Sequence, residues 1–230
     1  MAAPASERSG YEELASRRDQ LDRSSRSAQI ADIVRGSILD GSFRPGTRLS
    51  EPDICSALGV SRNTLREAFR SLVDQRLATH ELNRGVFVRV PSRADVGELY
   101  TCRRIIEGAG VRDPHGAAEL AGVRAALDAA EECARAQDWT GVGTADIAFH
   151  KAIAGLNHSM RIDEFMTSVW NELRLVFHVM ADPHTFHRPY LDRNREIYEA
   201  LAAQDVAAAE RLLLDYLTDA ERQILGAYPR

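Results

Sequence analysis

The chain has 230 residues, of which 44% are hydrophobic and 27% charged, an ordinary composition for a folded globular protein. No stretch approaches the roughly 18 apolar residues of a membrane-spanning helix, and the first residues lack the apolar core of a secretory signal. The three cysteines are scattered and form no C-x-x-C pair, which argues against a disulfide framework or a thiolate zinc site. We therefore expect a cytoplasmic protein with no membrane partner.

The net charge of −5 conceals a difference between two parts of the chain. Residues 24–91 carry ten arginines and seven acidic residues, a net charge of +3, whereas residues 92–230 carry 15 basic and 22 acidic residues, a net charge of −7. Lys151 is the one lysine in the chain, so the basic part contains only arginine, which suits bidentate recognition of phosphates and bases. This split predicts two domains with different partners.

The sequence pattern predicts a tail followed by two domains. We expect residues 1–23 to form a flexible tail, residues 24–91 the first domain, residues 92–94 a linker and residues 95–230 the second domain. In the first domain, a helix begins near residue 28 and ends at Gly41. Its apolar residues recur at helical spacing and are Ile30, Ile33, Val34 and Ile38.

Two short helices follow, each preceded by a serine that can cap its first turn. The first covers residues 51–58 after Ser50 and ends at Gly59, and its expected buried residues are Ile54, Ala57 and Leu58. The second follows Ser61, and its expected buried residues are Leu65, Ala68, Phe69, Leu72 and Val73. Two β-rich runs around residues 83–85 predict a hairpin. This order of elements is that of a winged helix-turn-helix.

The polar face of the second short helix is rich in residues that can contact nucleic acid. Its exposed residues would be Arg62, Asn63, Arg66 and Arg70, with Thr64 beside them. Arginine and asparagine side chains donate hydrogen bonds to base edges and phosphates, so this face favours DNA binding. Two alternatives remain at this point: a solvated arginine face, and a protein–protein adaptor built on the same fold.

Beyond residue 94 the apolar spacing is helical throughout. The candidate helices cover about residues 95–111, 117–136, 142–156, 161–181, 189–203 and 205–226. Six helices predict an all-α bundle that is large enough to bury its own core. The chain is therefore assigned to the mainly α class, with a winged helix-turn-helix followed by a helical bundle.

Motifs in both halves resemble the GntR family of bacterial transcriptional regulators, in its FadR-like branch with an FCD-type C-terminal domain. The strongest is L-G-V-S-R-N-T-L-R-E-A-F-R-S-L, residues 58–72, which is close to the family pattern L-G-V-S-R-x-x-V-R-E-A-L-x-x-L. R-G-V-F-V, residues 84–88, is similar to the family's wing. In the second half, R-R-I-I-E, residues 103–107, resembles R-x-x-L-E, and D-I-A-F-H, residues 146–150, matches D-x-x-F-H.

The resemblance implies which residues contact DNA. The residues that fall where the family's recognition helix meets bases and phosphates are Ser61, Arg62, Asn63, Thr64 and Arg66. Gly85 falls at the wing tip, near the minor groove, and we add Arg84 beside it and Arg70 on the helix face. Many relatives carry an arginine near the position of Pro52, so we expect that contact to be missing here.

The resemblance also implies a place for a divalent metal. FCD-type domains often hold an ion through an Asp and a His four residues apart, here Asp146 and His150, with two more His from the last two helices. This chain has Asn194 and Tyr216 at those places, and both are weaker ligands than imidazole for zinc-like ions. We therefore expect no metal cofactor. Whether a histidine nearby completes a site stays open, and the candidates are His178, His184 and His187.

Without a metal, Asp146, His150, Asn194 and Tyr216 would form a polar pocket in the bundle for a small ligand. Arg103 is a further pocket residue that suits a carboxylate, and the alternative is an ion pair with Glu107 one turn later. The resemblance implies a ligand-responsive transcriptional regulator that binds a palindromic double-stranded DNA operator as a homodimer. The other readings are a metal-dependent enzyme at Asp146 and His150, which we disfavour, and the winged-helix adaptor.

Overall fold

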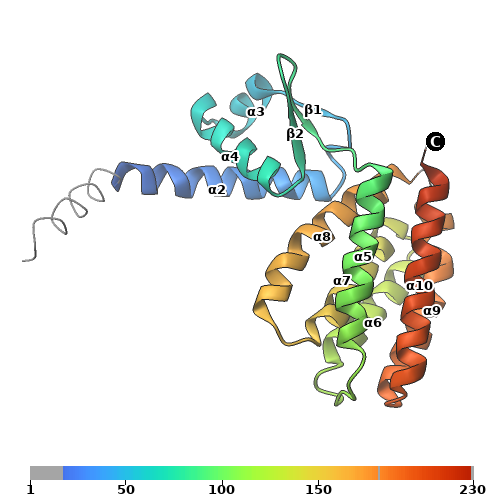
Figure 1. Ribbon diagram of the computed structural model, residues 1–230. Coiled ribbons are helices and arrows are strands. Elements are labelled where there is room, and N and C mark those ends of the chain that lie inside the picture. The colour runs from blue at the N-terminus through green and yellow to red at the C-terminus, as the bar shows by residue number, and fades with distance from the viewer. Residues whose placement is uncertain (1–17, 181, 229–230) are drawn as a thin grey trace, which may run out of the picture. The chain divides into compact units, whose positions relative to one another are not determined.

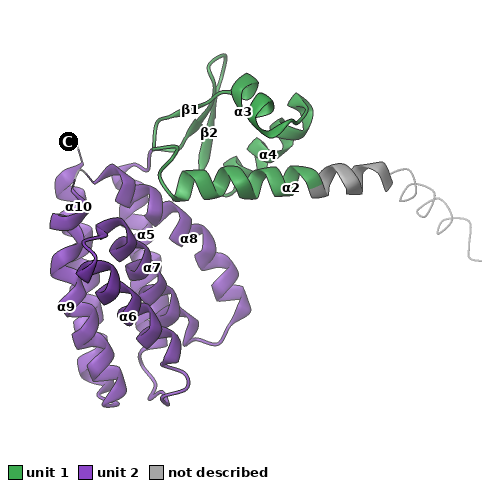
Figure 2. Ribbon diagram, turned by 180° about the vertical axis from the view of Figure 1, so that it is seen from behind, with its two compact units in different colours: residues 1–89 green, residues 90–230 purple. Residues whose placement is uncertain are grey.

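The computed structural model describes residues 18–180 and 182–228 (Figure 1). The chain divides into two compact units, residues 1–89 and residues 90–230 (Figure 2). Most of the predicted tail, residues 1–17, lies outside the described residues. Among the helices of the described part, none combines the length and apolar character needed to cross a membrane.

The first unit contains three helices and three short strands among the described residues. They are α2 (Arg18–Leu39), β1 (Arg48–Leu49), α3 (Glu51–Leu58), α4 (Arg62–Asp74), β2 (Ala78–Glu81) and β3 (Gly85–Val88). Helix α2 begins at Arg18, ten residues before the start expected from the apolar spacing and inside the segment 1–23 that was predicted to form a tail. The apolar spacing marks only the part of α2 that packs on the rest of the unit, whereas the preceding polar residues contain no glycine or proline that would end the helix.

Helices α2 and α4 pack against each other and supply most of the unit's core. The buried side chains of α2 are those of Ile30, Val34 and Ile38, and those of α4 are Leu65, Ala68, Phe69 and Leu72. Two predicted core residues were wrong: Ile33 is 53% exposed, and Ala57 lies on the exposed side of α3. Because α3 is only two turns long, it buries little beyond Ile54.

The predicted hairpin is present as β2 and β3, which pair antiparallel with Thr79 opposite Phe87. Asn83 in the connection and Gly85 at the start of β3 have φ angles of 62° and 107°, the left-handed region that these two residue types tolerate best. The two-residue strand β1 was not expected from the sequence. It pairs with β3, which gives the sheet order β1-β3-β2 and places β3 in the centre.

The second unit is a bundle of six helices, as expected, and its described residues include no strand. The helices are α5 (Arg93–Gly110), α6 (Ala121–Arg135), α7 (Trp139–Gly155), α8 (Met160–Val179), α9 (Pro183–Ala202) and α10 (Val206–Ala227). Residues 92–94 are not a linker, because α5 already begins at Arg93. The Ser92 hydroxyl oxygen accepts a hydrogen bond from the backbone N–H of Asp95, and the Asp95 carboxylate accepts one from the backbone N–H of Ser92.

Helix α9 begins at Pro183, six residues before its expected start. Asp182 caps it by accepting from the backbone N–H of His184, and a proline is tolerated in a first turn because the N–H it lacks has no helical partner there. Pro189 then lies inside the helix rather than at its beginning. The core of the bundle is apolar around a few buried polar groups, and its fully buried side chains include Phe149, Ile153, Leu173, Ile197, Leu213 and Leu217.

Candidate functional site

Two hydroxyl side chains cap the N-terminus of α4. Ser61 Oγ accepts a hydrogen bond from the backbone N–H of Thr64 at 3.2 Å, and the two hydroxyl oxygens lie 2.8 Å apart. Side-chain capping of this kind satisfies a backbone donor that the helix leaves free. Ser61 and Thr64 therefore fix the start of the helix, in addition to any contact they make with a partner.

The predicted arginine face is exposed. Arg62, Asn63, Arg66 and Arg70 all lie on the outer side of α4, and a shallow hollow along it is lined by Ser61, Asn63, Thr64, Arg66, Glu67 and Arg70. Arg66 Nε donates to both carboxylate oxygens of Glu51, at 3.0 and 3.2 Å. Within the described residues, Arg62 and Arg70 form no hydrogen bond or ion pair. These two guanidinium groups are therefore available to an anionic partner.

The hairpin presents a second basic group. Arg84 pairs with Glu81 and lies over the ring of Phe87, with its guanidinium carbon 5.2 Å from the ring centroid. Arg48 of β1 adds a guanidinium that the sequence analysis missed, since its Nε lies 3.6 Å from the position that a Cβ on Gly85 would take. Leu82 at the tip is 81% exposed, another feature without a sequence signal.

Six polar side chains from four helices of the bundle form what we call the buried polar cluster. They are Arg103, Glu107, Asp146, His150, Asn194 and Tyr216, all of them at most 5% exposed. All six are predicted from the sequence, although Glu107 only as the alternative partner of Arg103. The ion pair is present, with Arg103 Nε 2.7 Å from Glu107 Oε1.

Glu107 connects the arginine to the histidine. Its second oxygen, Oε2, lies 2.6 Å from His150 Nδ1, a hydrogen bond between α5 and α7. The arginine also lies over two aromatic rings, with its guanidinium carbon 4.9 Å from the Tyr100 centroid and 5.7 Å from that of Trp170. The ion pair with Glu107 and the two ring contacts together hold the guanidinium group in place.

Asp146 joins the last two helices to α7. Its Oδ1 accepts a hydrogen bond from Asn194 Nδ2 of α9 and another from the Tyr216 hydroxyl of α10, both at 2.8 Å. His150 Nε2 lies 3.9 Å from the same oxygen, which is too far for a hydrogen bond. The four predicted pocket residues therefore lie together, and Asp146 is the common hydrogen-bond partner of Asn194 and Tyr216.

The cluster holds its acids in the charged form. Burial by itself raises the pKa of Glu107, but the Arg103 charge and the His150 hydrogen bond outweigh burial, and the pKa is lowered. Burial also raises the pKa of Asp146, but His150 and the hydrogen bonds from Asn194 and Tyr216 outweigh burial, and the pKa is lowered. Burial and the charge of Asp146 raise the pKa of the Tyr216 hydroxyl, which keeps that hydroxyl a donor.

Three atoms of the cluster are left without a hydrogen-bond partner among the described residues. They are Arg103 Nη2, a donor, Asn194 Oδ1, an acceptor, and His150 Nε2, which can be either according to its protonation. A buried polar atom without a partner costs about 1–3 kcal/mol, so such atoms are uncommon in folded proteins. Three such atoms therefore lie together on side chains that the sequence predicts as a ligand pocket.

The cluster does not suit a tightly bound divalent metal. Asn194 and Tyr216 direct donor groups at Asp146 Oδ1, so that oxygen already accepts two hydrogen bonds and is not free for an ion. A neutral phenol and an amide are also poor ligands for zinc-like ions.

The three histidines left open by the sequence lie in different surroundings. His187 is 5% exposed, packs edge-on against Phe177 and Phe186, and interacts electrostatically with Asp146. His184 lies on the surface with its ring against Trp139, and His178 is half-buried on α8. None of them belongs to a group of three His, Cys, Asp or Glu ligand atoms close enough to share an ion, within the residues that the structure describes.

Each of the two units matches a known protein family. Residues 98–219 match the FCD domain, and residues 26–88 match the gntR family of bacterial regulatory proteins. A solved structure described as a transcriptional regulator GntR from Rhodococcus sp. RHA1 is 62% identical, with a TM-score of 0.86. The match covers 89% of this chain and 100% of that one.

Two curated relatives are similar over most of their length. The galactonate operon transcriptional repressor of Escherichia coli K12 is 26% identical over 221 residues, 85% of this chain and 95% of that protein. A protein of Paenarthrobacter nicotinovorans, named as a D-xylose utilization operon transcriptional repressor, is 27% identical over 212 residues, 86% of this chain and 88% of that protein.

Proposed function

The chain belongs to the GntR family and carries an FCD domain, and we propose that it binds a palindromic operator as a homodimer whose affinity is set by a small metabolite. Members of this family and the relatives of this chain regulate transcription and are not enzymes. The chain is a transcriptional regulator, which decides against the reading of Asp146 and His150 as the centre of a metal-dependent enzyme.

The observation that carries the proposal is the exposed arginine face of α4. Arg62 and Arg70 project from a capped helix and have no internal partner among the described residues. The β2–β3 hairpin adds Arg84, and the neighbouring strand β1 adds Arg48. In a helix-turn-helix protein the N-terminal residues of the second helix contact base edges in the major groove. Arg62 and Asn63 would read bases, and Arg70 and Arg84 would contact phosphates.

A palindromic operator follows from the single α4 in each chain. One recognition helix reads only a few base pairs, so two chains related by a two-fold axis would read two half-sites about one helical turn apart. Each chain would then contribute one half of the phosphate contacts. The adaptor alternative requires neither a palindrome nor a phosphate partner.

The effector is proposed to occupy the buried polar cluster. A carboxylate would accept from Arg103 Nη2, and hydroxyl groups would pair with His150 Nε2 and Asn194 Oδ1, the three atoms without a partner within the described residues. Galactonate, which one relative is named for, has both group types, whereas D-xylose has only the hydroxyls. A hydroxy acid therefore fits the cluster best. By linkage, effector and operator change each other's affinity by the same factor.

DNA binding is tested by fluorescence anisotropy on the DNA upstream of the gene, over a series of salt concentrations. The complex should contain two chains per palindrome by light scattering. Its affinity should fall steeply as salt rises, because each neutralised phosphate releases counterions and steepens the log–log plot by about 0.9. A complex that is insensitive to salt, or absent on all upstream DNA, would support the adaptor alternative.

The effector proposal is tested by thermal unfolding with three compounds. Galactonate combines a carboxylate with hydroxyls, galactose lacks the carboxylate, and hexanoate lacks the hydroxyls. Galactonate should raise the melting temperature more than either control compound, and the effect should be lost in Asn194→Ala. Thr218→Val, an exposed change on α10, is the matched control variant. Equal effects of galactose and galactonate would remove Arg103 from the proposed site.

A further inference from the structure

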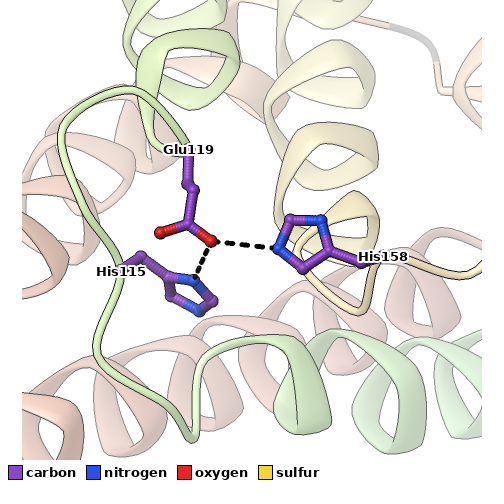
Figure 3. A group of neighbouring side chains, drawn as sticks. All are labelled: His115, Glu119 and His158. Carbon is purple, nitrogen blue, oxygen red and sulfur yellow. Dashed lines mark hydrogen bonds and ion pairs between the residues drawn. The ribbon is translucent and has the colours of Figure 1, made fainter.

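We propose that His115, Glu119 and His158 form a second site, which binds a zinc-like divalent ion through two imidazoles and one carboxylate. Figure 3 shows these side chains converging from the segment between α5 and α6 and from the connection between α7 and α8. One ligand atom from each residue lies within 4.8 Å of the other two. The proposal does not depend on the effector or on DNA binding.

The distances suit one ion. A tetrahedral ion with ligand atoms at about 2.1 Å separates those atoms by about 3.4 Å. Glu119 Oε1 lies 3.7 Å from His115 Nδ1 and 3.1 Å from His158 Nε2, so both separations are within about 0.3 Å of that value. Little movement of the side chains is needed to accommodate the ion.

His115 directs Nδ1, the ring nitrogen that can bind a metal, toward Glu119. Its Nε2 lies 2.7 Å from the carbonyl oxygen of Gly110, which can only accept, so Nε2 carries the proton and Nδ1 keeps its lone pair. The side chain is only 5% exposed, which holds the ring in place. Metal-binding histidines commonly donate their other N–H to a carbonyl or carboxylate, and this contact orients the ring in the same way.

The carboxylate is oriented too. Glu119 Oε2 accepts from the backbone N–H of Gly116 at 2.8 Å, which turns Oε1 toward the two imidazoles. In the metal-free state, the N–H of His158 can donate to Oε1 at 3.1 Å. When the ion binds, His158 would carry its proton on Nδ1, which leaves the Nε2 lone pair free to coordinate.

The backbone that carries the ligands is braced between α5 and α7. Asn157 Nδ2, next to His158, donates to the carbonyl oxygens of Ile106 at 2.9 Å and Ala154 at 2.8 Å. A Cβ on Gly110 would lie 2.5 Å from the carbonyl oxygen of Ile153, so the two helix ends are in close contact. His158 has a φ of 50°, a left-handed conformation in which helices commonly end, and its backbone N–H donates to the carbonyl oxygen of Gly155 at 3.0 Å.

The donor set indicates the kind of ion. Imidazole nitrogens with one carboxylate suit Zn²⁺, Co²⁺ and Ni²⁺, whereas Mg²⁺ and Ca²⁺ prefer oxygen ligands alone. Three protein ligands leave at least one position for water. A bound ion would tie the residues between α5 and α6 to the end of α7, and it would stabilise the second unit because the unfolded chain lacks the site.

The test uses the full chain after chelation and dialysis. Calorimetric titration with Zn²⁺ should show one ion per chain, and Co²⁺ should give a visible absorption band of tetrahedral geometry. Zn²⁺ should raise the melting temperature, and Mg²⁺ should not. Glu119→Gln and His158→Ala should each weaken Zn²⁺ binding by at least about tenfold. Both side chains are partly exposed, so neither change threatens the fold.

Two further variants keep the test specific. His80→Ala removes an exposed histidine of β2, and Asp146→Asn alters the buried polar cluster, so both should bind Zn²⁺ like the unmodified protein. If Zn²⁺ does not bind saturably, or if His158→Ala and Glu119→Gln bind it as well as the unmodified protein, the site is wrong. Loss of binding in Asp146→Asn alone would move the ion to the bundle interior.

Discussion

Arg66 of α4 donates from Nε to both carboxylate oxygens of Glu51 on α3, at 3.0 and 3.2 Å. The arginine that the family resemblance places on DNA is therefore already paired with an acid of the same unit. Water screens exposed ion pairs and leaves them weak, so DNA can separate this one at little cost. Glu51 nevertheless places a negative charge beside the face that would meet phosphates.

We expect Arg62→Ala to weaken operator binding by about 1–3 kcal/mol, the cost of losing a base contact. Arg66→Ala should weaken it less, because releasing Arg66 from Glu51 offsets part of its contact. Glu51→Gln should bind more tightly than the unmodified protein. Anisotropy titrations measure all three, with Arg211→Ala of the second unit as the exposed control. Weaker binding by Glu51→Gln would show instead that Glu51 positions Arg66 for DNA.

Two glycines of α7 make a matched pair for a packing prediction. A Cβ on Gly143 would lie 2.5 Å from His187 Nε2, and that ring cannot move away because Phe177 and Phe186 enclose it. Gly143→Ala should therefore destabilise the protein by about 1–3 kcal/mol in urea unfolding. Among the described residues nothing lies within 4 Å of a Cβ on Gly155, so Gly155→Ala should be neutral or stabilise by about 0.5 kcal/mol. Equal changes in the free energy of unfolding at positions 143 and 155 would contradict the close contact between Gly143 and His187.

The sequence predicted the elements well wherever apolar spacing and caps agree. Ser61, Gly59 and the apolar face of α4 are all local signals, and the helix forms where they indicate. The start of α2 was placed too late because the polar residues before position 28 show no apolar spacing, although they contain no glycine or proline that would end a helix. Strand β1 was missed because a strand of two residues is too short to show an alternating apolar pattern in the sequence.

The site was predicted as a set of residues but not as a network. The spacing of Arg103 and Glu107 allowed their ion pair, whereas the bond from Glu107 to His150 joins positions 43 residues apart and needs the tertiary fold. The same limit applies to His115 and His158, since the segments that bring them together have no recognisable spacing. Local sequence identifies which side chains are available, and packing decides which of them meet.

His187 provides a prediction about pH. Burial lowers its pKa below the ordinary value, Arg174 adds to this and Asp146 partly opposes it, so the folded protein favours the neutral ring. Below about pH 6.5 the unfolded chain takes up a proton more readily than the folded one, so this histidine destabilises the fold as the pH falls through that value. Stability should therefore decline from pH 7.5 to 5.5, and His187→Gln should flatten the decline.

Urea unfolding at several pH values measures that slope. His80→Gln, at an exposed ring in the first unit, should leave the slope unchanged. If His187→Gln shows the same pH dependence as the unmodified protein, then His187 is not held neutral in the fold.

Metal binding at the buried polar cluster can be measured without the proposed surface site in a His158→Ala background. There, a chelator should leave the melting temperature unchanged, because the donors of Asn194 and Tyr216 occupy Asp146 Oδ1. Adding Asn194→His and Tyr216→His should place two imidazoles beside Asp146 and His150, giving four ligands. Zn²⁺ or Ni²⁺ should then stabilise the protein, by about 2.7 kcal/mol at a hundred times the dissociation constant. Stoichiometric metal in the His158→Ala protein, found by elemental analysis, would contradict this account and make His187 the first ligand to replace.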